Sequence, residues 1–184
     1  LHIHLSLNNS RGENVFASPV NALSSMMRLC IAGQLALMPA SVAILAPGVN
    51  AFRRLRKNLT EPVFNSWGYN TRSAALRIPC SDDGNRRIEY RLAGADANPY
   101  LVAATILTGM LYGLEHIDEG DLPEPQHDQP ELPLFQQEAI EAFARCQYLT
   151  DSLGDAFSEQ WVACKLSELD WFERIVTQEE SHLA

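Results

Sequence analysis

Residues 86–93 read "RRIEYRLA", and the alternation within this stretch decides the fold. Successive side chains of a strand point to opposite faces. The apolar side chains of this stretch share one face and can be buried: Ile88, Tyr90 and Leu92. Arg87, Glu89 and Arg91 share the other face, where a solvated strand ordinarily carries Thr, Lys or Gln. The stretch therefore predicts a strand that buries one face and presents charged groups on the other.

Similar alternation recurs in two other segments. In "AALRIP" (74–79) the apolar positions oppose Arg77, and in "LHIHLSL" (1–7) four aliphatic residues oppose His2, His4 and Ser6. Residues 1–7 alone favour an ordinary half-buried strand, because alternation is first of all a burial signal. Recurrence in three strands favours a shared functional face on rigid elements. We expect that face to carry a mixed set of charged and imidazole groups: His2, His4, Arg77, Arg87, Glu89 and Arg91.

The remaining segments predict an α+β fold in one domain. A further strand is expected in residues 63–69, and a hairpin-like turn in residues 80–85. Ser18 and Pro19 predict the start of a helix that ends near Met38. Residues 39–52 predict a short second helix that is ended by Pro47 and Gly48. Residues 98–116 predict a central buried helix, because this stretch is apolar on nearly every side. Two or three further helices are expected within residues 134–177. We expect a curved, mainly antiparallel sheet with helices on one side.

Charge and composition limit the function classes. The formal net charge of −9 argues against a nucleic-acid-binding surface, which needs a positive field. Nine of the 14 Lys and Arg residues nevertheless lie within residues 53–91, and eight of these are arginines. Guanidinium groups suit carboxylates and phosphates, so we expect a small-anion site there; the alternative is a basic surface patch.

Cysteine spacing and apolar run lengths indicate the compartment. The four cysteines form no CxxC pair, which favours free thiols in a reducing cytoplasm. The longest apolar stretch, residues 101–114, is shorter than the roughly 18 residues of a membrane span. We therefore expect a cytoplasmic protein with no membrane partner.

Five motifs, in order, resemble the C-terminal half of the catalytic domain of glutamine synthetases, and most closely the γ-glutamylpolyamine synthetase branch. They are "LHIHLSL" (1–7), "VNAFRRL" (49–55), "WGYNTRSAALRIP" (67–79), "RRIEYRLAGADANPYL" (86–101) and "FERIVT" (172–177). The resemblance covers essentially residues 1–184. It implies that an N-terminal β-grasp domain and the first part of the catalytic domain precede this piece in a longer protein.

The resemblance also implies a reaction. The family joins the side-chain carboxylate of glutamate to an amine through a γ-glutamyl phosphate, using ATP and Mg²⁺ or Mn²⁺. Implied partners are glutamate and a small amine, putrescine-like or ammonia, and the full-length protein is expected to be a large homo-oligomeric ring. The piece alone is expected to be inactive, because most metal ligands of the family lie upstream.

Site roles are carried over residue by residue. By resemblance, His2 and Glu89 hold one divalent metal, His4 lies near the ATP phosphates, and Ser6 lies at the nucleotide. The implied metal site is rich in oxygen with one imidazole, which suits Mg²⁺ or Mn²⁺ better than structural zinc.

The arginines divide into two groups by the same resemblance. Arg72, Arg77 and Arg87 match those that hold ATP and the phosphoryl group in transfer, with Arg72 also in a catalytic role. Arg54 and Arg91 match those that hold the glutamate substrate. Arg72 can share the face of Arg77 only if it lies on the turn before that strand, because their numbers differ by an odd count.

The loop "RLRKNLTEP" (54–62) departs from glutamine synthetases, in which a glutamate before Ala-Pro helps to deprotonate ammonium. Thr60 occupies that position and cannot act as a general base, whereas Glu61 lies one residue late. The polyamine branch commonly lacks this glutamate, so the departure favours a larger amine in polyamine metabolism. The alternatives are glutamine synthetase itself and a non-catalytic structural relative.

Overall fold

A computed structural model describes residues 1–19, 22–57, 62–125 and 130–176. Its four-stranded sheet has the order β1-β4-β3-β2. The strands are β1 (Ile3–Leu5), β2 (Trp67–Tyr69), β3 (Leu76–Ile78) and β4 (Ile88–Tyr90). β4 pairs antiparallel with both β1 and β3, while β2 pairs parallel with β3. The mainly antiparallel sheet is therefore confirmed, with strands shorter than predicted.

The first helix differs from its prediction at both ends. α1 (Ser25–Leu45) begins after Ser24, whose side chain accepts a hydrogen bond from the Met27 amide, so the predicted start at Ser18 and Pro19 is wrong. The predicted break near Met38 is also wrong, because the helix continues through Pro39. Proline leaves the carbonyl four residues earlier without its helical donor.

A side chain from the segment before β2 satisfies that carbonyl. Asn65 Nδ2 donates to the Leu35 oxygen at 2.9 Å, which lets α1 run on past Pro39. α1 is long and apolar enough to cross a membrane by length and composition, but 78% of its most apolar window is buried within the fold. Its apolar character is that of a core helix.

The next two helices are α2 (Val49–Phe52) and α3 (Pro99–His116). Asn98 caps α3 as predicted, accepting from the amides of Tyr100 and Leu101. α3 packs backbone to backbone on α1, where an added Cβ on Gly113 would lie 1.9 Å from the Leu29 oxygen. The prediction of burial on all sides is wrong, because the outward-facing Leu107 and Leu111 are about half exposed.

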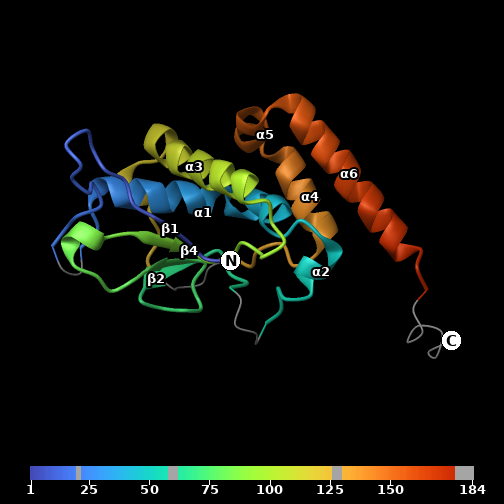
Figure 1. Cartoon of the computed structure of the whole chain (residues 1–184), viewed down its shortest axis with the longest axis horizontal. Helices are drawn as coiled ribbons and strands as arrows, with labels where there is room; N and C mark the ends of the chain where they lie inside the picture. Colours follow the sequence, from blue (N-terminus) through green and yellow to red (C-terminus); the bar gives the residue numbers. More distant parts are fainter. Residues whose placement is uncertain (20–21, 58–61, 126–129, 177–184) are drawn as a thin grey trace.

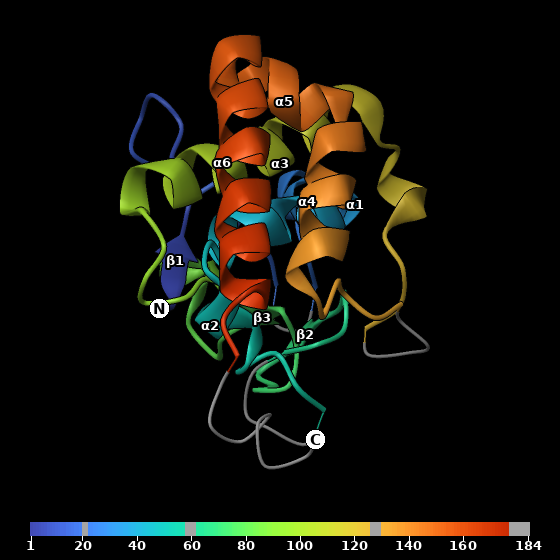
Figure 2. The same ribbon diagram turned by 90° about the vertical axis from the view of Figure 1, so that its right-hand side faces the viewer.

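The last three helices of the described residues agree with the two or three predicted for this region. They are α4 (Gln136–Arg145), α5 (Gln147–Leu153) and α6 (Asp155–Glu173). Two short 3-10 turns, η1 (Asp83–Asn85) and η2 (Glu119–Asp121), lie in the connections. Figure 1 shows α1 between the sheet and α3, with α4 to α6 gathered near its C-terminal end. Figure 2 shows α6 running alongside α4.

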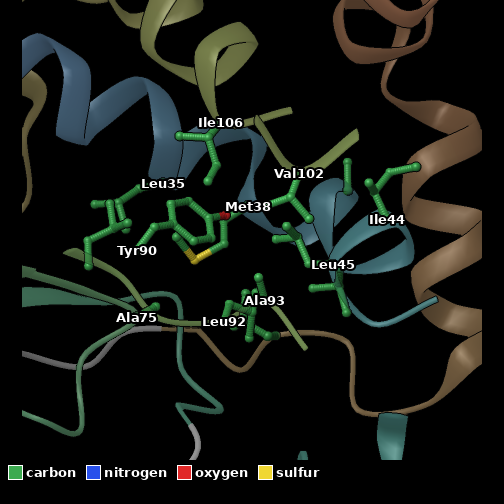
Figure 3. Close-up of a cluster of buried hydrophobic side chains, with 14 of the residues drawn as sticks. Leu35, Met38, Ile44, Leu45, Ala75, Tyr90, Leu92, Ala93, Val102 and Ile106 are labelled. Atoms are coloured by element: carbon green, nitrogen blue, oxygen red, sulfur yellow. The ribbon is translucent and has the colours of Figure 1, made fainter. Parts of the chain in front are cut away.

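The core lies between the sheet and α1. Figure 3 shows the Tyr90 ring among the side chains of Leu35, Met38 and Ile106, which come from α1 and α3. The Tyr90 hydroxyl forms a hydrogen bond with the Ser41 side chain. One face of the sheet thus packs against α1, and the opposite face is available for charged groups.

Candidate active site

Strand register brings three of the predicted residues to one face. His4 and Arg77 are each the direct Cα partner of Glu89, on β1 and β3 respectively. Directly opposed residues of neighbouring strands point to the same side of a sheet. The alternate residues Ile88 and Tyr90 are buried in the core. The predicted charged face is therefore present.

Glu89 is the centre of this face, and its side chain is only 3% exposed. Arg77 Nη1 lies 2.7 Å from its Oε2, and Arg91 Nη1 lies 2.7 Å from its Oε1. His2 Nδ1 lies 3.1 Å from the same Oε1. Burial alone would raise the pKa of Glu89, but the hydrogen bonds and charges of Arg77 and Arg91 outweigh it and lower the pKa. Glu89 is thus held as a carboxylate.

His4 is oriented by a neighbouring arginine. Arg87 Nε donates to His4 Nδ1 at 3.2 Å, and Arg87 Nη1 donates to the Asn85 oxygen at 3.0 Å. Because Nδ1 of His4 accepts, the neutral ring carries its proton on Nε2. His4 and Ser6 are both exposed. The His4 Nε2–H is therefore a donor fixed in orientation by Arg87.

The two arginines predicted to hold glutamate, Arg54 and Arg91, both lie at the end of β4. Arg54 Nη2 donates to the oxygen of Leu92, the residue after Arg91. An added Cβ on Gly94 would lie 2.7 Å from Arg54 Nη2, so the absence of a side chain there makes room for the guanidinium. Arg72 is exposed in the bend immediately before β3. This is the turn position that its odd spacing from Arg77 requires.

Sequence reasoning missed Asn70. It follows β2, has a left-handed φ of 46°, and accepts a hydrogen bond from Arg77 Nη2 at 2.5 Å. Asn is one of the few residues that adopt this conformation readily. The signal in the sequence was an Asn directly after an apolar strand and seven residues before the site arginine.

The predicted loop residues Thr60 and Glu61 lie outside the described residues. The segment after them is anchored by short pairing with residues 130–132. The Leu132 amide donates to the Val63 oxygen at 2.9 Å, and the Asn65 amide donates to the Pro130 oxygen at 2.9 Å.

Comparisons with known proteins decide the family. A family model described as glutamine synthetase, catalytic domain, matches residues 1–183. The chain belongs to the glutamine synthetase family. Gamma-glutamylputrescine synthetase PuuA of Escherichia coli (strain K12) is 43% identical to it, over 98% of this chain and 39% of that protein. Glutamine synthetase of Pyrococcus woesei is 32% identical, over 100% of this chain and 43% of that protein.

The solved structures agree with this family in fold. A GmaS/ADP complex superposes with a TM-score of 0.87 at 27% identity, over 100% of this chain and 45% of the other. The chain thus spans about two fifths of the length of its glutamine synthetase relatives. The mixed α and β architecture is that of the family.

Glutamine synthetases use divalent metals, and part of a fitting donor set is present. Two neighbouring ligands of an octahedral ion with bonds of about 2.1 Å lie roughly 3.0 Å apart. The 3.1 Å between His2 Nδ1 and Glu89 Oε1 matches this separation. The part of the chain that the structure describes contains no group of three or more His, Cys, Asp or Glu residues able to hold a metal. His2 and Glu89 could therefore supply two donors to such an ion, and a complete site would need others.

Proposed function

We propose that this chain is the C-terminal part of the catalytic domain of a longer enzyme, and that this enzyme joins the side-chain carboxylate of glutamate to a small amine at the expense of ATP. The preferred amine is putrescine-like. The observation that carries the proposal is the buried Glu89 carboxylate, held by Arg77, Arg91 and His2 on one sheet face. A buried carboxylate with its cationic partners is no more stabilising than a well-packed apolar group of similar size, so stability alone does not account for this cluster.

Each of these groups has a task in such a reaction. A carboxylate is a poor electrophile, so glutamate first takes the γ-phosphoryl group of ATP, and the amine then displaces phosphate from the acyl phosphate. Arg77 and Arg87 offer guanidinium groups to the charge on the phosphoryl oxygens. The oriented Nε2–H of His4 adds a neutral donor beside them. A divalent ion held by His2 and Glu89 would supply further positive charge for the phosphates.

The arginines at the end of β4 serve the other substrate. Arg54 donates to the Leu92 oxygen and Arg91 to the Glu89 carboxylate, and guanidinium groups suit the carboxylates of glutamate. Ser6 and Arg72, both exposed beside β1 and β3, complete the nucleotide side in this proposal.

Two observations favour a polyamine over ammonia. The identity to gamma-glutamylputrescine synthetase PuuA is 43%, against 32% to the Pyrococcus woesei glutamine synthetase. Thr60 stands where glutamine synthetases carry a general base, and general-base help is typically worth about 10² to 10⁴-fold in rate. An enzyme without that glutamate needs another proton acceptor, for which Glu61 is the nearest in sequence. The alternative, glutamine synthetase itself, remains the second candidate.

The test is a coupled phosphate-release assay on the full-length protein with ammonia, putrescine and spermidine. We expect the highest kcat/KM with putrescine. Glu61→Ala should have a modest effect, because Glu61 is shifted by one residue from the position of the family's general base. Thr60→Glu should reduce putrescine use, because the new side chain adds bulk and charge. A higher kcat/KM for ammonia than for putrescine would refute the polyamine assignment. Activity with none of the three amines would refute the ligase.

The proposal extends to the whole assembly. We propose a homo-oligomeric ring in the cytoplasm, with the missing metal donors supplied from outside residues 1–184. Residues 1–184 alone should then release no phosphate from ATP and glutamate, because two ligands hold a divalent ion poorly. Measurable turnover by this piece would contradict that division.

A further inference from the structure

We infer that Asn70 is a positioning residue that holds the Arg77 guanidinium between two acceptors, so that Arg77 serves the phosphoryl group without fully neutralising Glu89. This inference rests on the proposed function, since it concerns the same site. Asn70 belongs to none of the residues that the sequence assigned a role, and within the described residues its side chain reaches the site through Arg77.

Both terminal nitrogens of the Arg77 guanidinium are hydrogen-bonded. Nη1 donates to Glu89 Oε2 at 2.7 Å, and Nη2 donates to Asn70 Oδ1 at 2.5 Å. Arg77 lies on β3, between β2 and β4 in the sheet, so its guanidinium bridges the end of β2 and the middle of β4. Two fixed contacts define both the direction and the plane of a guanidinium, whereas one contact leaves it free to rotate.

The backbone of Asn70 is itself tied to β3. Its amide donates to the Ile78 oxygen at 2.8 Å, directly beside Arg77 in sequence. Its φ of 46° is left-handed, where Asn and Gly are tolerated and most residues are strained. Asn therefore meets two demands at once, the backbone conformation and a short, uncharged acceptor; glycine would meet only the first.

Loss of the Asn70 acceptor has a defined consequence. With Nη2 released, Arg77 can rotate to place both nitrogens on the Glu89 carboxylate, the bidentate arrangement that arginine and carboxylate prefer. Glu89 would then be more strongly paired and a poorer partner for a cation at the His2–Glu89 position. Arg77 would also be withdrawn from the phosphate side.

The experiment compares full-length wild type with Asn70→Gly, Asn70→Asp and the control Asn9→Gly. Asn9 also accepts hydrogen bonds through Oδ1, from the amides of Arg11 and Glu13, but in an exposed turn without a contact to Arg77 in the described residues. For Asn70→Gly we expect kcat to fall about tenfold, the size expected for losing one hydrogen bond to a charged group, with an unchanged melting temperature. Asn70→Asp keeps the acceptor and should recover most of kcat, while its charge raises KM for ATP. Asn9→Gly should keep the wild-type kcat.

A second readout does not depend on turnover. Mn²⁺ binding to each protein is measured from the electron paramagnetic resonance signal of the free ion. We expect Asn70→Gly to bind Mn²⁺ several-fold more weakly than wild type, and Asn9→Gly to match wild type. An unchanged Mn²⁺ affinity, or an Asn70→Gly kcat within twofold of an active wild type, overturns the positioning role. A wild type that turns over no amine, with the Mn²⁺ difference retained, refutes the proposed function and supports the role of Asn70.

Discussion

Replacing Glu89 with glutamine in the full-length protein keeps the shape of the side chain and removes its charge. Arg77 and Arg91, 20% and 9% exposed, then lose their shared counter-charge, and the new amide N–H₂ faces one of them as a second donor. Removing one partner of a buried ion pair typically costs about 3 to 5 kcal/mol. Because glutamine still offers one acceptor and Arg77 is partly solvated, we expect a loss of about 3 kcal/mol.

The loss should depend on pH. The pKa of Glu89 is lowered in the folded protein from its ordinary value of 4.5. A carboxyl group with a lowered folded pKa stabilises the fold above its unfolded pKa and loses that contribution as pH falls through the folded pKa. The stability difference between wild type and Glu89→Gln should therefore be full above about pH 5 and shrink below pH 4.5.

Thermal unfolding from pH 3.5 to 7, followed by circular dichroism, measures this difference. The control is Glu131→Gln, which removes the same charge from an ion pair with Lys57 whose side chains are 43% and 59% exposed. Such a surface pair is worth roughly 0 to 1 kcal/mol, so the control should unfold almost as wild type does. A Glu89→Gln difference that stays constant from pH 7 to pH 3.5 would refute the ion-pair argument.

Two further predictions test the packing around the site. Gly113→Ala should destabilise the full-length protein by about 2 kcal/mol or more. Its Cβ would meet the Leu29 carbonyl at 1.9 Å, so α1 and α3 must separate. The control is Gly120→Ala, where no atom lies within 4 Å of the added Cβ, and equal melting temperatures for the two variants would contradict this prediction. Gly94→Ala should leave the melting temperature unchanged but raise KM for glutamate about fivefold, because the new Cβ would meet the Asp96 carboxylate and the flexible end of Arg54, and both side chains must shift. Steady-state kinetics check this, and an unchanged KM counts against the Arg54 assignment.

The face of the sheet was predictable because strand alternation is strict. A residue two positions along a strand returns to the same face, so the co-location of Arg77, Glu89 and the histidines follows once residues are assigned to strands. Family resemblance added the roles, which alternation cannot supply. The parallel pairing of β2 with β3 could not be read in this way, because alternation carries no information on strand direction.

Errors arose where a tertiary contact overrides a local rule. Pro39 ordinarily ends a helix, but Asn65, distant in sequence, supplies the donor that the Leu35 oxygen lacks. The cap of α1 is Ser24 and not Ser18 for a related reason. The Ser24 hydroxyl also donates to the Val15 oxygen, which fixes Ser24 in the capping position. Asn70 was missed because its importance lies in one side-chain contact across two strands.

The charge balance of the described face bears on how the reaction divides between parts of the protein. On the described part of this face Arg77 and Arg91 contact the Glu89 carboxylate and Arg87 contacts His4, so the face is net positive and favours anions. The same field repels a protonated diamine and a divalent cation. If the proposed reaction is correct, the carboxylates that complete the metal site and receive the amine must therefore come from outside this face. In that case the arginine-rich half would bind the anions and the complementary acidic half the cations, and amine selectivity would be separable by mutation from the binding of ATP and glutamate.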